Sequence, residues 1–348
     1  IDTAKRIIDR EGDKYLEVSP ELRQEMLIKI ALEEKLEAIK LTLERFGVNY
    51  DVWFSEQMLH DSGEVEDTVS ELQKKGLIYE KEGALWFKST QFGEEKDEVV
   101  VRKNGFPTYF AADIAYHKNK FERGYDEILN VWGADHHGYV PRIYSSAKLL
   151  GYDAEKLKII LYQLVALKKS GKIVSMSTRA GEFVTLKEIL SELGRDAARF
   201  FLLMRAPNST IEIDLDLAKK QTAENPVFYV QYAAARISSV FDQAAKRGKG
   251  LRKDVRWDLL NEPIEREIML SVAVFGDLLI QCRKDMTTHY ITNYLVEMAR
   301  RLHSFYEKCR VLSDDSELTN SRIALLTVVR KTMRLGLNVL GVTAPEKM

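Results

Sequence analysis

Two mainly apolar segments with a helical segment between them constrain the fold of this chain more than any other feature. Residues 127–132 and 157–165 carry few charged side chains, which is typical of parallel strands covered on both faces. Residues 142–150, which lie between them, have a helical pattern. A strand, a helix and a second strand in this order predict a doubly wound α/β unit with a parallel sheet.

The rest of the first 224 residues adds helices and short strands to this unit. A long helix is predicted over residues 19–44, because Ser19 is a suitable N-cap and Pro20 suits the first helical position. Thr108 is a second N-cap candidate, for a helix that ends near residue 121. Strands are predicted at residues 50–54, 85–88 and 98–102, and after residue 186 the pattern is wholly helical.

A domain boundary is predicted at Asn225, because Pro226 disfavours helical geometry at the residue before it. Four or five amphipathic helices follow up to residue 340, so we divide the chain into an α/β part, 1–224, and a helical bundle, 225–348. The second part holds 19 Lys+Arg and 14 Asp+Glu, a net charge of +5, whereas the whole chain carries −1. This distribution is a modest indication of a polyanionic partner, and an ordinary solvated surface explains it equally well.

The composition argues against several classes of protein. Cys282 and Cys309 are the only cysteines and match no CxxC spacing, so neither a disulfide framework nor a zinc site is expected. This use of cysteine suits a reducing cytoplasm. No apolar stretch approaches the roughly 20 residues that span a bilayer, so no membrane association is expected.

A glycine-rich segment, GADHHG at residues 133–138, directly follows the first predicted parallel strand. Glycines at the carboxyl end of such a strand let the backbone approach a nucleotide, and Asp135 can accept hydrogen bonds from ribose hydroxyls. A turn that caps a helix would have the same composition. Metal binding is a third reading, disfavoured because no further ligands occur at a recognisable spacing.

A polar, basic segment, GKIVSMSTRAG at residues 171–181, is flanked by glycines as mobile loops often are. Four cations lie in or beside it: Lys168, Lys169, Lys172 and Arg179. They could stabilise negative charge on a leaving pyrophosphate. An exposed basic turn without a ligand would look similar.

Tyr109 and Asp113 lie four residues apart on the helix that Thr108 begins, and therefore share one helical face. A carboxylate can bind a planar guanidinium through two parallel hydrogen bonds, and an aromatic ring can stack on it. A surface aspartate beside a half-buried tyrosine is the alternative.

In this order and spacing, the segments resemble arginyl-tRNA synthetases of class I. The resemblance rests on residues 108–116 (TYFAADIAY), 132–138 (WGADHHG), 176–179 (MSTR), 225–236 (NPVFYVQYAAAR) and 344–348 (APEKM). It covers nearly the whole chain. The fold that it implies is a partial Rossmann-type catalytic region followed by an all-α anticodon-binding domain of the DALR type.

The resemblance also implies a role for each candidate residue. Arginine would be bound by Tyr109, Asp113 and His136, and ATP by Gly133, Asp135, His136, Leu164, Val165 and Met176. The catalytic signature loop would supply Met176, Ser177 and Arg179, together with Lys172. The tRNA would be contacted by Tyr232, Arg236, Phe305 and Tyr306, with the interior of a helix bundle as the competing explanation for these aromatic residues.

The implied activity is that of an arginine–tRNA ligase, which uses ATP and Mg²⁺ to form arginyl-adenylate and then charges tRNA(Arg). A cytoplasmic monomer without a structural metal is expected. Thr178 stands where the family usually has a second lysine, and no His-x-Gly-His motif occurs anywhere in the chain. We therefore expect the carboxy-terminal part of such an enzyme, inactive by itself.

Three rival readings remain. The chain could be a non-catalytic tRNA-binding fragment or paralogue. It could belong to another class I synthetase, such as those for cysteine or methionine, although these commonly carry zinc-binding cysteines. More remotely, it could be a nucleotide-binding regulator with an α/β core.

Overall fold

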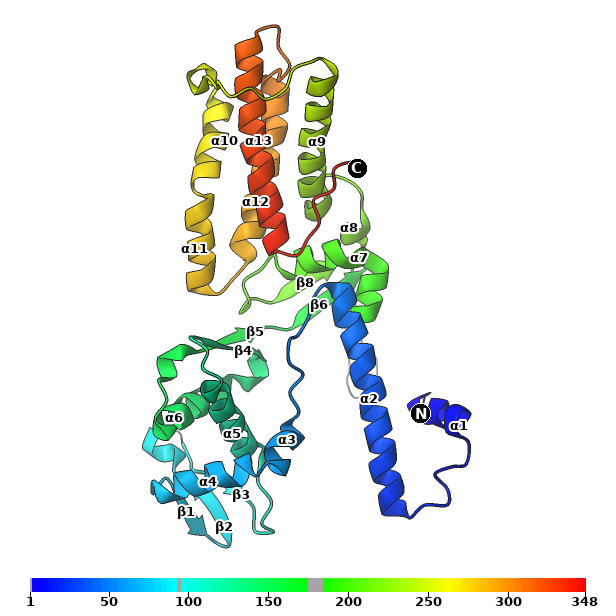
Figure 1. Ribbon diagram of the computed structural model, residues 1–348, viewed down its shortest axis with the longest axis vertical. Helices are drawn as coiled ribbons and strands as arrows, with labels where there is room; N and C mark the ends of the chain where they lie inside the picture. Colours follow the sequence, from blue (N-terminus) through cyan, green and yellow to red (C-terminus); the bar gives the residue numbers. More distant parts are fainter. Residues whose placement is uncertain (1, 93–94, 175–183) are drawn as a thin grey trace.

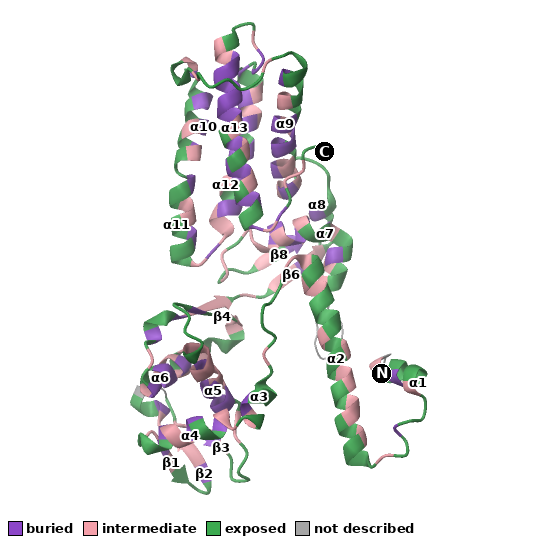
Figure 2. Ribbon diagram, viewed as in Figure 1, coloured by how far each residue is buried: buried purple, intermediate pink, exposed green. Residues whose placement is uncertain are grey.

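The computed structural model describes residues 2–92, 95–174 and 184–348, which form an α/β part below a bundle of long helices (Figure 1). Two separate hydrophobic cores hold it together. One core lies around α5 and β4 in the lower part, and the other fills the helical bundle and continues into β6, α7 and β8. Figure 2 shows these buried positions as the inner faces of the elements.

The first long helix, α2 (Pro20–Phe46), follows a short helix, α1 (Asp2–Glu11). The prediction of a helix at residues 19–44 is confirmed. The Ser19 hydroxyl accepts a hydrogen bond from the Leu22 N–H, and Gly47 ends the helix in the left-handed conformation, with φ at 77°. Figure 1 shows most of α2 extending away from the body of the protein, and none of its residues is buried.

The strand predicted at residues 50–54 is wrong. This segment is extended, but among the described strands none pairs with it. Instead it links α2 to α3 (Glu56–Asp61), and the Phe54 ring stacks on the Tyr116 ring with centroids 4.4 Å apart. The aromatic pattern of the segment therefore reflects packing against a helix rather than strand pairing.

The predicted α/β unit is present and lies beside a small antiparallel sheet. That sheet follows α4 (Glu64–Lys74) and consists of β1 (Ile78–Lys81), β2 (Ala84–Phe87) and β3 (Glu98–Val101), with η1 (Ser89–Phe92) after β2. The unit itself consists of α5 (Tyr109–Glu122), β4 (Ile128–Gly133), η2 (Ala134–Tyr139), α6 (Val140–Leu150), η3 (Ala154–Lys156) and β5 (Leu157–Tyr162). β4 and β5 are parallel and in register from Ile128 opposite Leu157 to Gly133 opposite Tyr162.

The parallel pair is covered on one face only in the described structure, contrary to the prediction from its composition. Ile128 and Asn130 are buried, whereas the alternate residues Leu129 and Val131 are 50% and 62% exposed. Figure 1 shows the pair between α5 and α6 on one side and the helical bundle on the other. The exposed face borders a cleft of about 590 Å³ that Leu129 and Ile160 line with residues of the bundle.

A third sheet connects the two parts. The strand predicted at residues 157–165 is split, because the chain leaves β5 at Tyr162 and begins β6 (Val165–Lys169). β6 pairs antiparallel with β7 (Lys172–Ile173) and parallel with β8 (Ile211–Asp214). The wholly helical prediction after residue 186 is therefore wrong at β8, which is too short for its alternation to stand out between α7 (Leu186–Leu202) and α8 (Leu215–Lys219).

Five α-helices form the bundle, as the sequence predicts. They are α9 (Pro226–Lys246), α10 (Pro263–Ala273), α11 (Phe275–Asp285), α12 (His289–Lys308) and α13 (Ser316–Val339), with η4 (Trp257–Leu259) before α10. Asn225 caps α9 by accepting a hydrogen bond from the Val227 N–H. Helix α9 thus begins where the boundary is predicted, although the upper core includes Phe200 and Ile213 from before it.

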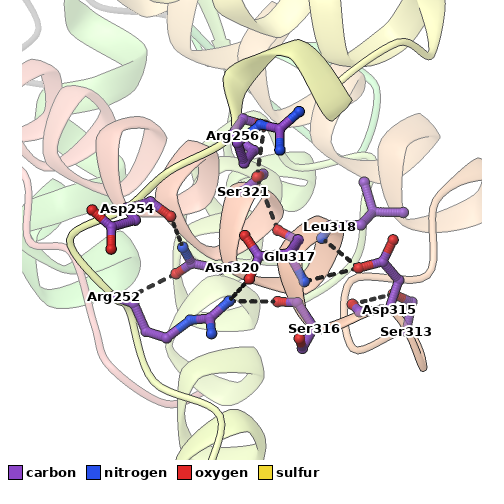
Figure 3. A network of polar contacts seen from close by, with 10 residues as sticks. All are labelled: Arg252, Asp254, Arg256, Ser313, Asp315, Ser316, Glu317, Leu318, Asn320 and Ser321. Carbon is purple, nitrogen blue, oxygen red and sulfur yellow. Dashed lines mark hydrogen bonds and ion pairs between the residues drawn. The ribbon is translucent and has the colours of Figure 1, made fainter.

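A polar network fixes the basic connection between α9 and α10 to the start of α13 (Figure 3). The buried Asn320 side chain accepts a hydrogen bond from the Arg252 N–H and donates one to the Asp254 carbonyl. Ser321 Oγ donates to the Arg256 carbonyl, and Asp315 caps α13. Since backbone groups are satisfied by side chains of the helix, this long loop keeps a defined path over the end of the bundle.

Arg199 of α7 joins the carboxyl ends of two helices that are far apart in sequence. Its Nε donates to the Leu340 carbonyl at 2.8 Å, just after α13, and its Nη1 donates to the Phe46 carbonyl at 3.1 Å, at the end of α2. A cation at these positions also complements the negative ends of both helix dipoles. The contact leaves no room for a side chain at Gly341, where a Cβ would lie 2.6 Å from Arg199 Nε.

Gly341→Ala is expected to lower the free energy of unfolding by about 1–3 kcal/mol, because it adds this contact to the cost of a left-handed backbone at φ 68°. Gly248→Ala is the matched control, since Gly248 has φ 65° and no described atom lies within 4 Å of the position that its Cβ would occupy. Urea unfolding followed by circular dichroism measures both. Equal losses in the two variants would show that the Arg199 contact contributes nothing.

Candidate active site

The amino end of α5 carries the first two candidate residues. Thr108 Oγ1 caps the helix through the Ala111 N–H and donates to the Val99 carbonyl at 2.8 Å, so the first turn is tied to β3. Tyr109 and Asp113 follow at i, i+4 spacing on α5. The Tyr109 side chain is 74% exposed, whereas Asp113 is half-buried. An exposed ring above a half-buried carboxylate suits a ligand with a planar cationic group.

The carboxyl end of β4 carries the second group. Gly133 ends the strand, and the short 3₁₀ helix η2 that follows presents Asp135 and His136, both exposed. His136 Nε2 lies 3.7 Å from Asp135 Oδ2, and its ring lies 6.2 Å from the Trp132 ring. A Cβ at position 133 would collide with Asp135 Oδ1, so glycine lets this carboxylate fold back over the strand end.

The two groups interact electrostatically. Burial raises the pKa of the Asp113 carboxyl to about 6, and the charge of Glu56 raises it further, while Lys120 and His136 oppose the rise. Burial and the Asp113 charge also raise the pKa of Tyr139, at the end of η2. Asp113 therefore lies within electrostatic interaction range of His136 and Tyr139.

Asp113 is expected to lower the stability of the fold at neutral pH. Because its pKa is raised from 3.8 to about 6, the folded chain binds this proton more tightly than the unfolded chain does. The resulting stability is fully present below about pH 4 and is lost as the pH rises through about 6. Asp113→Asn should therefore melt a few degrees above the wild type at about pH 7.5, with the difference shrinking toward zero near pH 4. Circular-dichroism melts across this range test the sign, and a variant that melts lower at pH 7.5 would contradict it.

Only some of the remaining candidate residues near the strand ends lie within the described ranges. Leu164 is 83% exposed in the link after β5, and Val165 begins β6 opposite Ile211. Lys172 is exposed in β7, while Lys168 and Lys169 form ion pairs with Glu212 and Glu192. Met176, Ser177, Thr178 and Arg179 lie outside the described residues.

The four residues predicted to contact tRNA differ in accessibility. Tyr232 is 41% exposed and lies in a row of aromatic rings on α9 and α12, with Phe228 at 6.2 Å and His303 at 5.9 Å between ring centroids. The Arg236 guanidinium covers the Tyr306 ring at 4.4 Å, and the Tyr306 hydroxyl is buried without a hydrogen-bond partner among the described atoms. Phe305 is fully buried in the bundle, so its ring is not accessible to a tRNA base.

Sequence reasoning did not identify the polar residues behind Asp113. The charges of Glu56 and of Lys120, seven residues after Asp113, shift the pKa of Asp113. The charge of Asp113 in turn raises the pKa of Tyr139. The spacing to Lys120 was a usable signal, because residues i and i+7 share a helical face. Tyr139 and Glu56 belong to other elements, and no local pattern connects them to α5.

Among the described residues no group of three or more His, Cys, Asp and Glu side chains is arranged to hold a metal ion. A search of the helices in the described ranges finds none with the length and apolar character needed to cross a bilayer.

Comparison with known proteins gives matches along nearly the whole chain. The family model for class I tRNA synthetases (R), catalytic domain, matches residues 19–238, and the DALR anticodon binding domain matches residues 230–348. The arginine–tRNA ligase of Moorella thermoacetica is 53% identical over 99% of this chain and 62% of its own length. That of Heliobacterium modesticaldum is 52% identical, over 100% of this chain and 63% of its own length. The chain thus spans somewhat under two thirds of the curated relatives that it matches.

Comparison with solved structures also gives matches to arginyl-tRNA synthetases. A putative arginyl-tRNA synthetase from Campylobacter jejuni superposes with a TM-score of 0.89 at 33% identity, covering 100% of this chain and 75% of that one. The arginyl-tRNA synthetase of Thermus thermophilus, at 22% identity and a TM-score of 0.76 over 98% of this chain and 68% of that one, shares the fold. The catalytic family model covers more than half of the chain, and the Campylobacter jejuni protein, at 33% identity, matches all of this chain and 75% of its own. The chain therefore belongs to the arginyl-tRNA synthetase family of class I.

Proposed function

We propose that the complete polypeptide containing this chain is an arginine–tRNA ligase. The observation that carries the proposal is the half-buried Asp113 carboxylate on α5, electrostatically coupled to His136 at the end of β4. This arrangement offers a site for a forked cation next to a site for a nucleotide. Tyr109, exposed on the same helix, provides the stacking surface.

The reaction needs positioning and charge stabilisation rather than a covalent enzyme intermediate. An arginine carboxylate oxygen attacks the α-phosphorus of ATP, the bond to the β-phosphate oxygen breaks, and pyrophosphate leaves with that electron pair. A terminal ribose hydroxyl of the tRNA then attacks the arginyl carbonyl, AMP leaves, and the hydroxyl proton is released. ATP is proposed to enter with the Mg²⁺ bound to its phosphates, which suits a cation that keeps several waters and few protein ligands.

The roles proposed for individual residues come from the family resemblance. The arginine substrate would be bound by Tyr109, Asp113 and His136. The ribose of ATP would be bound by Gly133 and Asp135. Leu164 and Val165 would border the adenine, after the neighbouring strand end. Lys172, with Met176, Ser177 and Arg179, would bind the phosphates. Selectivity against lysine would come from Asp113, because an ammonium group cannot form two parallel hydrogen bonds with a carboxylate.

The helical domain is proposed to bind the anticodon stem and loop of tRNA(Arg). Its net charge of +5 favours phosphate contacts, and Tyr232 offers an exposed ring on which a base could stack. Arg236 lies one turn further along α9. We propose that the enzyme acts as a monomer in the cytoplasm, where tRNA is charged for protein synthesis.

The test is aminoacylation by the complete polypeptide with ATP, tRNA(Arg) and labelled amino acids. Arginyl-tRNA is expected, and lysine at equal concentration should give none above background. Salt-sensitive tRNA binding without charging would instead indicate a non-catalytic tRNA-binding protein. Charging with an amino acid other than arginine would refute the substrate assignment.

A further inference from the structure

A buried chain of polar side chains connects β4 to the main chain of α5 at Asp113. Lys120 Nζ donates to Asn130 Oδ1 at 2.8 Å, and Asn130 Nδ2 donates to His117 Nε2 at 2.7 Å. His117 Nδ1 lies 2.7 Å from the Asp113 carbonyl oxygen. His117 and Asn130 are each only 3% exposed.

The direction of the three hydrogen bonds is fixed by the groups at the two ends. A lysine ammonium can only donate and a carbonyl oxygen can only accept, so His117 must carry its proton on Nδ1 and leave Nε2 as an acceptor for Asn130. Burial, followed by the charge of Lys120, lowers the pKa of His117 to about 4, which keeps the ring neutral with a single proton. The buried side-chain nitrogen and oxygen atoms of His117 and Asn130 thus all have partners, and such networks hold one arrangement.

We propose that Lys120, Asn130 and His117 are positioning residues for arginine binding, which fix the α5 main chain at Asp113 against β4 through this one-directional hydrogen-bond relay. The inference deepens the proposed function and rests on it. The relay begins at Lys120 of α5, passes through Asn130 of β4, the strand whose carboxyl end would bind the nucleotide, and ends on the residue that would bind the substrate cation. It therefore sets the spacing between the two halves of the site.

Two further observations support the assignment. The Lys120 ammonium lies 4.1 Å from the Tyr116 ring centroid, so this normally flexible side chain is held from two sides. Its charge also opposes the rise in the pKa of Asp113, and Asp113 in turn partly offsets the lowering of the pKa of Lys120 to about 8. Lys120 thus favours the ionised carboxylate that a guanidinium ligand needs, without occupying the place of the ligand.

The experiment compares two lysines of α5 in the complete polypeptide. Lys120→Met removes the start of the relay, and Lys120→Arg restores a donor for Asn130. Lys118→Met is the matched control, because Lys118 pairs with Glu71 of α4 at 2.7 Å and takes no part in the relay. KM for arginine and KM for ATP are measured separately in the aminoacylation reaction.

We expect Lys120→Met to raise KM for arginine by about 10- to 100-fold while KM for ATP changes less than about 3-fold. Lys120→Arg should recover most of the loss, and Lys118→Met should leave both constants unchanged. Asn130→Leu, which breaks the centre of the relay, should reproduce the pattern of Lys120→Met. If Asn130→Leu does not fold, the Lys120 pair decides alone, since Lys120 lies at the more accessible end.

Two outcomes would overturn the inference: an equal rise of both KM values in Lys120→Met, or equal effects of Lys120→Met and Lys118→Met. Either result would show that the network only supports the fold. Failure of the proposed function looks different. In that case the wild-type polypeptide would form no arginyl-tRNA, whatever the behaviour of the variants.

Discussion

Asp113→Asn in the complete polypeptide is expected to lower kcat/KM for arginine by at least about 100-fold while leaving KM for ATP within about 3-fold. The asparagine has nearly the same shape but carries no charge and offers one acceptor oxygen instead of two. The amide NH₂ of the asparagine would face the guanidinium, and no hydrogen bond can form between them because both groups only donate. Loss of one partner of a buried, hydrogen-bonded charge pair costs about 2–5 kcal/mol, a factor of about 30 to 5,000, and the expected loss lies within this range.

The matched control is Asp153→Asn. Asp153 caps η3 at the opposite end of the parallel pair, through the Glu155 N–H, and asparagine is an equally good capping residue. Both constants should therefore be unchanged. Normal arginine kinetics in Asp113→Asn would remove the substrate assignment, and an equal rise of both KM values would point to a general disturbance of the site.

This variant also separates function from stability. The carboxylate that would bind arginine is partly buried. Burial, followed by the charge of Glu56, raises the pKa of Asp113, so the ionised carboxylate opposes folding at neutral pH. A variant that folds more stably and yet cannot select arginine would show that the residue is retained for binding. Stability and activity often conflict at sites of this kind.

Local signals accounted for much of the fold. Ser19 and Thr108 cap the helices predicted from them, and each accepts the expected hydrogen bond from a backbone N–H. The boundary predicted at Asn225 coincides with the start of α9. The strand, helix and strand around residue 140 were visible because composition and order both pointed to a parallel pair. Where a side chain interacts with residues close to it in the chain, the sequence alone is enough to predict the local structure.

Elements that depend on distant partners could not be predicted in this way. β8 is four residues long and exists because it pairs with β6, more than 40 residues earlier. The aromatic segment around Phe54 resembles a strand, yet Phe54 packs on a helix. The exposure of Leu129 depends on what covers the second face of the sheet, which composition does not report.

The same distinction applies to the site. Tyr109 and Asp113 were predicted as site residues through helical spacing, and Gly133 and Asp135 through their place after a strand. The relay behind them was not found, because Asn130 meets His117 only after β4 has packed on α5.

The largest loss of stability outside the site is expected for Arg322→Met. Arg322 Nε lies 2.7 Å from Glu265 Oε1, the carboxylate is fully buried, and Arg322 Nη1 also donates to the Arg310 carbonyl at 2.9 Å. Methionine keeps much of the volume but leaves the Glu265 charge without its partner. Removing one member of a buried ion pair costs about 3–5 kcal/mol, against less than about 1 kcal/mol for an exposed pair.

Two comparisons test this account by urea unfolding. Arg252→Met is the matched control, because Arg252 forms an ion pair with Glu317 in which the side chains are 52% and 45% exposed. The double variant Glu265→Gln/Arg322→Met removes both charges, and the glutamine can still accept the hydrogen bond that Glu265 Oε2 accepts from the Glu262 N–H at the start of α10. It should be clearly more stable than Arg322→Met alone, because no buried carboxylate then remains unpaired. A double variant as unstable as Arg322→Met would show that the loss arises from packing and the Arg310 contact. In that case the pair would serve to fix α10 against α13 rather than to neutralise a charge.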